Sequence, residues 1–312
     1  MSVISPILAL PAPLATGISP QLAQTLAFGV TGAYVGGLYV AQHFFGTKTA
    51  APNEPAYPPP GHRNHPATMR LRMKAVISTT RLCMAGVFWT VKRTGNLEFK
   101  GALKATIRLL GLSTAAIRNP LAYLLAPLLF IGPLYSSFLD GTLPGQHNAE
   151  PLEFGLTEQR NYVIGPLTEE LSFRSCIIAV SLLGHLSPKW IVFGTPLWFG
   201  LGESFSCVQL ANDQPTFTML LRCSVSLAAP AAPPSQQLPV PLGYTSLFGW
   251  YASYLYLRTG SVVPSMAAHI FCNYMGLPDI AGAIERNPKR KLSIAIAYLA
   301  GIAGFVYGLK RL

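Results

Sequence analysis

The 312-residue chain is poor in charge, and acidic residues are its scarcest charged group. Only 11% of its residues are charged, against roughly 25% in ordinary soluble domains. Asp and Glu number 12 and Lys and Arg 23, whereas half of all residues are apolar. A soluble protein with so few charges would struggle to cover its surface, and several apolar runs reach the ~20 residues that cross a bilayer. The composition therefore predicts an all-α fold, a polytopic helical bundle with about seven or eight membrane segments.

The net charge of +11 forms no patch interleaved with aromatic residues, as a surface for nucleic acid would. The basic residues lie in short loops beside apolar runs, which is the pattern produced by the cytoplasmic bias of Lys and Arg. These clusters fall within residues 63–74, 92–93, 286–291 and 310–311. We therefore expect contact with the lipid bilayer and no nucleic-acid partner.

The sequence also lacks paired cysteines and a charged leader. Its five cysteines have no CxxC spacing, so they indicate neither a zinc site nor a disulfide framework and fit small apolar residues inside helices. No basic residue precedes the first apolar stretch, so a cleaved signal peptide is not expected. The first span would then serve as its own targeting signal.

Apolar runs and the breaks between them place the expected elements along the chain. Residues 1–20 are Pro-rich and predicted to be weakly structured, and residues 46–70 form a Pro-rich loop. Residues 103–117 fit an amphipathic helix at the membrane interface. The segments expected in the membrane are 22–45, 76–91, 121–138, 161–183, 190–202, 242–257, 261–277 and 294–309.

The segment 161–183 carries Glu169, Glu170 and Arg174. Ionisable groups inside a membrane cost several kcal/mol unless they are paired or face water, so they are candidates for function. Glu170 and Arg174 are four residues apart and share a helix face, where they can form an ion pair. Glu169 is turned about 100° away and is predicted to stay free to accept a proton from water. The alternative is a polar triplet that only locks helices together.

His269 and Asn273 are also four residues apart, on an otherwise apolar helix. An imidazole can orient water or shuttle protons, and an amide can donate a hydrogen bond to a developing oxyanion. A single His on such a helix is more often a satisfied core residue. The pairing of His with Asn, beside a helix with two Glu and one Arg, favours a functional site.

These residues carry a resemblance to a known family. Residues 169–174 (EELSFR) match the EExxxR motif, and residues 269–273 (HIFCN) the HxxxN motif, of the CAAX protease and bacteriocin-processing family. Within it, the type II CAAX endopeptidases are similar to residues 165–170, 247–249, 257–260 and 269–276. The resemblance covers residues 63–278. We accordingly divide the chain into residues 1–62, a first span with a Pro-rich loop, and residues 63–312, a CAAX protease-like membrane domain.

The resemblance implies a multi-pass intramembrane endopeptidase of the endoplasmic reticulum that removes the last three residues of prenylated CAAX proteins. Its partners would be farnesylated or geranylgeranylated proteins such as Ras-like GTPases. Glu169 would be the base that activates water, with Glu170 and Arg174 as its support and with His269 and Asn273 as the second half of the site. No cofactor is assigned. Two carboxylates and one His without HExxH form a thin ligand set for zinc, and the motifs leave metal dependence open.

The family's middle motif, FxxxH, is not intact, because Glu203 occupies the His position after Phe199. No His lies between His185 and His269, so one group of the family's active site is missing. We interpret residues 203–241, which turn rich in Ser, Ala, Pro and Gln, as aberrant sequence from a faulty gene model. Codons permitted here contain an intron donor and acceptor, and splicing would restore Ala-His-Val-His-His-Ala after Leu201. A second frame correction would be needed before Leu242.

Two other functions remain as alternatives. A catalytically impaired membrane scaffold is the better interpretation if Glu203 truly replaces the histidine. An ion-coupled transporter would also use Glu, Arg and His inside spans, but the sequence does not contain the broken helices and repeated halves typical of such carriers. Activity on a prenylated peptide separates the protease from both.

Overall fold

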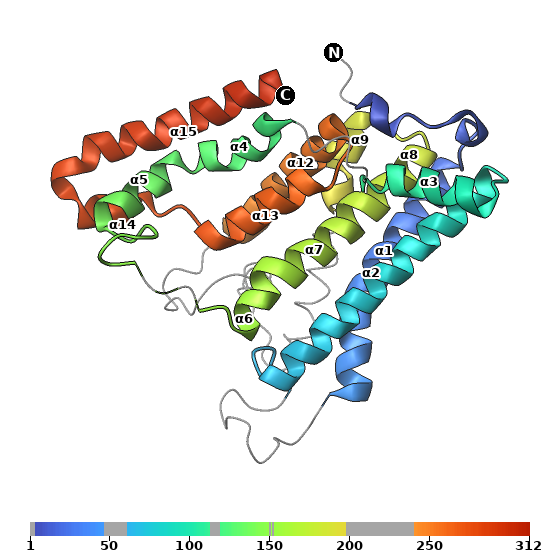
Figure 1. Cartoon of the computed structure of the whole chain (residues 1–312), viewed down its shortest axis with the longest axis horizontal. Coiled ribbons are helices and arrows are strands. Elements are labelled where there is room, and N and C mark those ends of the chain that lie inside the picture. Colours follow the sequence, from blue (N-terminus) through green and yellow to red (C-terminus); the bar gives the residue numbers. More distant parts are fainter. Residues whose placement is uncertain (1–3, 47–60, 113–118, 150, 152, 198–239) are drawn as a thin grey trace.

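The computed structural model describes residues 4–46, 61–112, 119–149, 151, 153–197 and 240–312 (Figure 1). All regular structure within these ranges is helical, which confirms the predicted all-α class. The α-helices are α1 (Pro20–Phe45), α2 (Pro66–Thr94), α3 (Phe99–Leu109), α4 (Pro120–Leu129), α5 (Ile131–Asp140), α6 (Leu156–Glu158), α7 (Gly165–Glu169), α8 (Ile177–Leu183), α9 (Pro188–Phe193), α12 (Val240–Thr259), α13 (Val263–Met275), α14 (Ile280–Arg286) and α15 (Lys291–Arg311). Shorter turns are η1 (Pro6–Leu8), η2 (Ala12–Leu14) and η8 (Pro288–Arg290), and the π-helical turns are η4 (Gln159–Ile164) and η5 (Glu170–Cys176).

Several helices begin with the same local signal, a polar cap followed by proline. The hydroxyl of Ser19 accepts a hydrogen bond from the Leu22 amide, and Pro20 follows as the first residue of α1. Ser187 and Asn119 play the same part at the starts of α9 and α4. The cap satisfies an amide that has no partner inside the helix, and proline has no amide hydrogen to satisfy.

The structure breaks the segment 121–138, which the sequence predicted as one clean span. α4 and α5 meet at Phe130 and are bent by 58°. Pro133 explains the break, because it has no N–H for the Leu129 carbonyl and its ring crowds that carbonyl. The prediction of a single uninterrupted helix is therefore wrong at this position.

Small residues let α15 pack closely on the broken pair. A Cβ added to Gly301 would lie 2.9 Å from the carbonyl oxygen of Leu128, and one added to Gly132 would meet the ring of Tyr298. Glycine at such positions lets two backbones approach, as is typical of helices packed in membranes. Figure 1 shows α15 running alongside α4 and α5.

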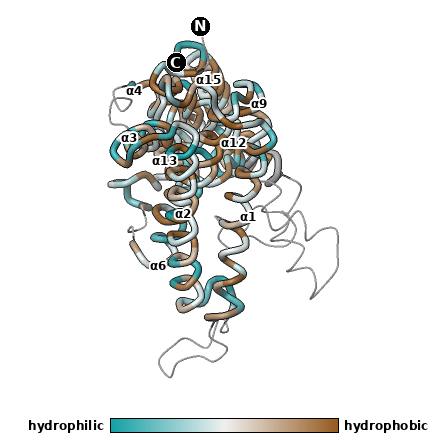
Figure 2. Tube along the Cα trace, turned by 90° about the vertical axis from the view of Figure 1, so that its right-hand side faces the viewer, coloured by the Kyte–Doolittle hydropathy of each residue, from teal (hydrophilic) through white to brown (hydrophobic). Residues whose placement is uncertain are grey.

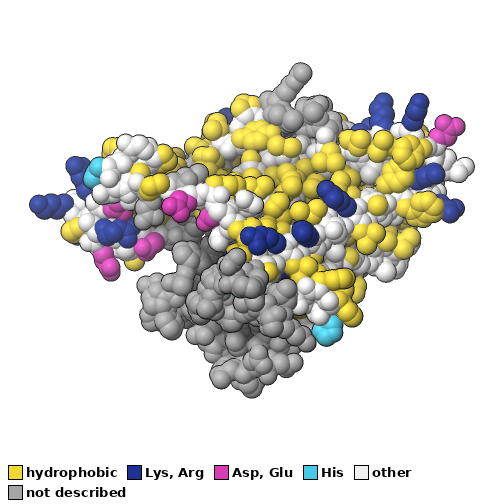
Figure 3. Space-filling view, turned by 60° about the horizontal axis from the view of Figure 1, so that its bottom comes forward, with side chains coloured by type: hydrophobic (Ala, Val, Ile, Leu, Met, Phe, Trp, Pro, Cys, Tyr) yellow, Lys and Arg dark blue, Asp and Glu magenta, His cyan; other side chains and the backbone are white. Residues whose placement is uncertain are grey.

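By length and apolarity, one described helix can cross a membrane, Pro288–Arg311, and the bent pair α4 and α5 passes the same test together. The outward face of α15 is apolar, with Leu292 and Leu299 71% and 67% exposed. Hydrophobic side chains cover much of the face shown in Figure 3. Contact with lipid would explain this surface. Multiple spans, and their number, stay a prediction.

Other boundaries differ modestly from the expected ones. α2 is 29 residues long and begins at Pro66, so it is longer than the predicted segment 76–91 and shortens the loop before it. α3 ends at Leu109, before the predicted end of the amphipathic helix. Residues 4–18 are more ordered than expected: Leu8 and Leu14 are buried, and the Ser5 amide bonds the Leu257 carbonyl at 2.7 Å.

Two apolar cores flank the centre of the molecule. The larger core joins α1, α2 and α8, and the smaller one joins α4, α12 and α13. Figure 2 shows α1 and α2 extending together from the rest of the bundle, with hydrophilic residues near their far ends. The helical stretch 156–183 packs beside α2 on one side and α13 on the other, and its last part, α8, belongs to the larger core. This stretch, called the Glu helix below, carries the predicted site.

Candidate active site

The Glu helix is a continuous run of α6, η4, α7, η5 and α8. Its central charged residues are withdrawn from solvent: Glu169 is 7% exposed, Glu170 0% and Arg174 4%. The second π-helical turn begins at Glu170. Such turns are rare and occur often at functional sites. Burial of three ionisable groups is costly without partners, so the contacts around them decide what the site can do.

Hydroxyl groups hold the Glu helix against α1 and α2. The hydroxyl of Tyr34 on α1 lies 3.0 Å from that of Thr168, which also donates to the Ile164 carbonyl at 2.7 Å. On α2, the Thr80 hydroxyl lies 3.0 Å from that of Ser172. Thr168 and Ser172 are four residues apart and flank the two glutamates, so these bonds fix the position of the charged turn.

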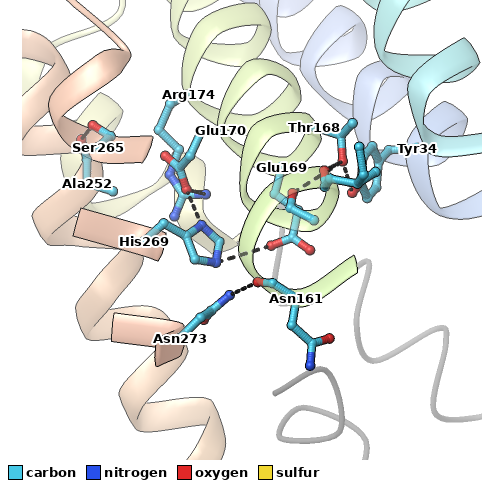
Figure 4. Close-up of polar contacts among 12 residues, drawn as sticks. Tyr34, Asn161, Thr168, Glu169, Glu170, Arg174, Ala252, Ser265, His269 and Asn273 are labelled. Carbon is cyan, nitrogen blue, oxygen red and sulfur yellow. Dashed lines mark hydrogen bonds and ion pairs between the residues drawn. The ribbon is translucent and has the colours of Figure 1, made fainter. Parts of the chain in front are cut away.

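α13 brings His269 between the two glutamates (Figure 4). Its Nδ1 lies 2.8 Å from Oε1 of Glu170, and its Nε2 lies 3.7 Å from Oε2 of Glu169. The predicted ion pair is present, because Nη1 of Arg174 lies 3.2 Å from the same Oε1 of Glu170. Glu169 takes no part in this ion pair, and its carboxylate faces the imidazole. α13, which is distant from the Glu helix in the sequence, fills the space beside Glu169.

The other carboxylate oxygen of Glu170, Oε2, is buried and has no hydrogen-bond partner among the described residues. Oε1 alone receives both Arg174 and His269. Because Oε1 accepts from Arg174 and has no hydrogen to offer, we assign Nδ1 of His269 as the N–H that donates a hydrogen bond to it. That tautomer leaves a lone pair on Nε2, on the side of Glu169.

Phe248 of α12 completes the packing around these charges. Its ring centroid lies 4.9 Å from that of His269 and 5.6 Å from the guanidinium carbon of Arg174. An aromatic face stabilises a nearby cation, and here it also limits the rotation of the imidazole. The sequence stretch 247–249 belonged to the family resemblance, but its role was not predicted. Tyr34, Thr168, Thr80 and Ser172 were missed as well.

Asn273 lies on the same side of α13 as His269, as its spacing predicted. Its Nδ2 donates a hydrogen bond of 2.9 Å to the backbone carbonyl of Asn161, in the first π-helical turn (Figure 4). An amide nitrogen has two hydrogens, so the second remains for another acceptor. The bond also ties α13 to the Glu helix below the His269 contact.

An open apolar groove of about 530 Å³ lies on the face of α13 adjacent to the one that carries His269 and Asn273. Its lining is aromatic and aliphatic, contributed by Phe154, Tyr162, Ala267, Ile270, Phe271 and Tyr274. Tyr162 and Tyr274 meet edge to face with centroids 5.9 Å apart. Ile270 and Tyr274 follow His269 and Asn273 in sequence, so the groove lies around the helix from the polar site.

The structure does not test the position of Glu203 in the FxxxH motif or the interpretation of segment 203–241 as aberrant sequence. Phe199, Glu203 and nearly all of the segment 203–241 lie outside the described residues. Within the described ranges, no group of three or more His, Cys, Asp or Glu side chains is arranged to hold a metal ion. The sites of Cys207 and Cys223 are likewise outside those ranges.

Fold and site together define an all-helical protein whose buried glutamate pair, arginine and histidine meet between two helices. The family model described as "Type II CAAX prenyl endopeptidase Rce1-like" matches residues 158–275, which include all of these groups. CAAX prenyl protease 2 of Homo sapiens is 30% identical over 290 residues, which cover 90% of this chain and 78% of the human protein. The chain therefore belongs to the CAAX prenyl protease 2 family, the Rce1-like type II CAAX prenyl endopeptidases.

Other relatives match over shorter regions. Probable CAAX prenyl protease 2 of Schizosaccharomyces pombe is 36% identical over 191 residues, 58% of this chain and 65% of the yeast protein. CAAX prenyl protease 2 of Arabidopsis thaliana is 36% identical over 149 residues, 47% of this chain and 41% of the plant protein. The matched region thus spans less than two thirds of these two relatives. No solved structure matches the chain.

Proposed function

We propose that this protein is an intramembrane endopeptidase that removes the C-terminal tripeptide of prenylated CAAX proteins. The observation that carries the proposal is the position of His269, which faces Glu169 with one ring nitrogen and Glu170 with the other. This arrangement lies inside the region matched by the family. Farnesylated or geranylgeranylated proteins, including Ras-like GTPases, would be the substrates, and the endoplasmic reticulum membrane the location.

The reaction begins with a water between Glu169 and His269. The 3.7 Å between Oε2 and Nε2 is too long for a direct hydrogen bond and suits two acceptors that share one water. Glu169 removes a proton from this water as its oxygen attacks the carbonyl carbon of the prenylated cysteine. The tetrahedral intermediate collapses with cleavage of the C–N bond. The proton held by Glu169 passes to the departing amine, and the tripeptide leaves.

The remaining groups position the reactants and stabilise charge. Glu170, held by Arg174, fixes the imidazole tautomer so that the lone pair of Nε2 faces the water. Asn273, whose Nδ2 already bonds Asn161, would donate its second amide hydrogen to the oxyanion. Preorganised donors of this kind contribute a few kcal/mol because they need no rearrangement during the reaction.

The apolar groove on α13 supports a lipid-modified substrate. Its volume of about 530 Å³ and its aromatic lining suit a prenyl chain, and it lies beside the helix that carries His269 and Asn273. A prenyl group in this groove would place the modified cysteine near the glutamates. The exposed apolar surface of α15 fits a bilayer, from which such a substrate would arrive.

Two alternative functions, a scaffold and a transporter, are each favoured by a specific feature of the sequence. Glu203 at the motif's His position favours a catalytically impaired scaffold, provided that the printed segment 203–241 exists in the protein. An ion-coupled transporter would use the same buried charges as a proton relay. Sequencing of the transcript decides the first point, since a cDNA that retains the segment in frame ends the idea of a faulty gene model.

The experiment is release of the tripeptide from a farnesylated CAAX peptide, identified by its mass, in membranes that lack an endogenous protease. The printed chain and the chain with Ala-His-Val-His-His-Ala restored and the frame repaired are compared. We expect cleavage by the restored chain, at least tenfold faster with the lipid than without it, since burial of a C15 chain contributes several kcal/mol. If neither chain cuts while a relative does in the same assay, the proposal fails and the scaffold is favoured.

A further inference from the structure

α3 carries two different stripes of side chains next to each other. Its inner face is buried, because Ala102, Thr106 and Leu109 pack toward α2 and η1. At about 100° per residue, most of the remaining positions fall into one apolar stripe and one adjacent basic stripe. The apolar stripe contains Phe99, Leu103 and Ile107, and the basic stripe contains Lys100, Lys104 and Arg108.

The apolar stripe is open to its surroundings. Its three residues, Phe99, Leu103 and Ile107, are between 40% and 62% exposed. The ring of Phe99 meets that of Phe88 on α2, with centroids 5.4 Å apart, so the end of α2 lies beside the stripe. Trp89, the next residue of α2, is itself 55% exposed. Tryptophan is enriched at the boundary between the hydrocarbon of a membrane and water.

Basic side chains border these apolar residues. Within the part of the chain that the structure describes, Lys100 and Lys104 form no ion pair. The guanidinium carbon of Arg93 lies 4.7 Å from the centroid of the Trp89 ring, and Nζ of Lys92 lies 5.9 Å from it. A ring face orients a cation without neutralising its charge. The positive charges around α3 are therefore available to an anion.

Charge and apolar surface together indicate the partner. Residues 92–108 contain five basic residues and one acidic residue, Glu98, and Arg108 is bonded to a neutral acceptor, the Ala9 carbonyl. A soluble anion needs only the charges, whereas an anionic lipid presents its charge directly beside apolar chains. Parallel apolar and basic stripes match that order and are typical of helices that lie in the plane of a membrane surface. On the right of Figure 3, where Figure 1 places α3, Lys and Arg side chains lie among hydrophobic ones.

We propose that α3 and the adjoining end of α2 form a binding surface for anionic phospholipids, called the α3 surface below. Phe99, Leu103 and Ile107 contact the upper part of the acyl chains, and Lys100 and Lys104 bind the headgroups. The α3 surface anchors the end of α2, the helix that holds the Glu helix through Thr80. The inference rests on the membrane location in the proposed function and is independent of the peptidase chemistry.

The test measures lipid association, so it does not depend on turnover. The full chain is placed in phosphatidylcholine nanodiscs in which part of the lipid is replaced by brominated phosphatidylserine or brominated phosphatidylcholine, whose bromine atoms quench nearby tryptophan. Subtracting the signal of the Trp89→Phe chain isolates Trp89. We expect the serine lipid to associate at least about fivefold more strongly than the choline lipid, the order expected for one basic residue at a membrane surface. About 1 M salt should reduce this preference by screening.

A matched pair of double variants locates the binding charges. Lys100→Gln with Lys104→Gln should lower the preference to about twofold or less. The control is Arg70→Gln with Lys74→Gln, which removes the same charge from two exposed residues with the same spacing of four. Arg70 and Lys74 precede Trp89 by more than about 20 Å along α2, so this control should keep the full preference.

A third double variant, Leu103→Gln with Ile107→Gln, tests the apolar stripe. It should weaken quenching by both lipids alike and keep their ratio, because it removes contact with the chains and leaves the charges. All of these substituted residues are exposed, and thermal unfolding close to that of the starting chain shows that each variant folds. Glycerophosphoserine, the headgroup without acyl chains, should not reverse the quenching when it is added in excess.

Three results overturn the proposal: no preference for the serine lipid in the starting chain, equal losses in the two charge variants, or reversal by the soluble headgroup. The first favours a protein partner for α3, the second a response to net charge alone, and the third a site for a free anion. Release of tripeptide by a chain without the lipid preference refutes this inference and leaves the peptidase. A lipid preference in a chain that releases no tripeptide leaves the α3 surface in place and refutes the peptidase instead.

Discussion

The two helices that meet at the site are built in different ways. The Glu helix is buried along 172–183, contains two π-helical turns, and is bonded through hydroxyls to α1 and α2. α13 is an ordinary α-helix in which most residues are buried or partly buried and only Ile270 and Tyr274 are exposed. Two of its side-chain bonds, from His269 and Asn273, are contacts with the Glu helix.

This difference in packing indicates which substitutions should lower stability and which should lower activity. Glu170 and Arg174 form a buried ion pair in the packed core, so removing one leaves its partner buried without a counter-charge. The polar residues of α13 reach the site from a helix whose own packing does not need them. Variants of Glu170 or Arg174 are therefore expected to lower stability strongly, and variants of His269 or Asn273 to lower mainly activity.

The largest effect on stability is expected for Glu170→Gln. It leaves Arg174, which is 4% exposed, without its carboxylate partner. Breaking a buried pair from one side costs about 3–5 kcal/mol, which should appear in the free energy of unfolding in mixed micelles. The double variant Glu170→Leu with Arg174→Met should recover most of the stability but not the activity. A double variant no more stable than the single one would contradict this account of the pair.

A smaller effect, confined to the rate, is expected for Asn273→Ala. Loss of an oxyanion donor lowers kcat by about 100-fold or more, whereas loss of one partly exposed hydrogen bond changes stability by only about 1 kcal/mol. The measurement pairs tripeptide release with thermal unfolding. Ser265→Ala is the matched control on α13, since its hydroxyl bonds the Ala252 carbonyl away from the glutamates. Equal losses of rate in the two variants would sink the oxyanion role.

Local spacing predicted the contacts that lie within one helix. The Glu170–Arg174 pair and the shared face of His269 and Asn273 both follow from a separation of four residues. The limits of α12 and α13 also agree closely with the apolar runs. The π-helical turns and the break at Phe130 were not predicted, because they depend on how a backbone adjusts to neighbouring helices and to Pro133.

Contacts between distant segments could not be derived from spacing at all. His269 and Glu170 are 99 positions apart, and only the family resemblance suggested that they meet. Phe248 lies in a stretch that carried the resemblance, but its contacts with His269 and Arg174 could not be predicted. The contact of Tyr34 could not be predicted either, since an aromatic residue in an apolar helix fits an ordinary core position.

The most direct test of the two-helix site is a double-mutant cycle on Glu169 and His269, measured as kcat/KM for tripeptide release by whichever chain is active. If both groups act on one water, Glu169→Gln and His269→Ala should each cost about 1,000-fold or more, and the double variant little more than the worse single one. Effects that multiply would show that the two residues act independently. That result would contradict a shared water between the Glu helix and α13.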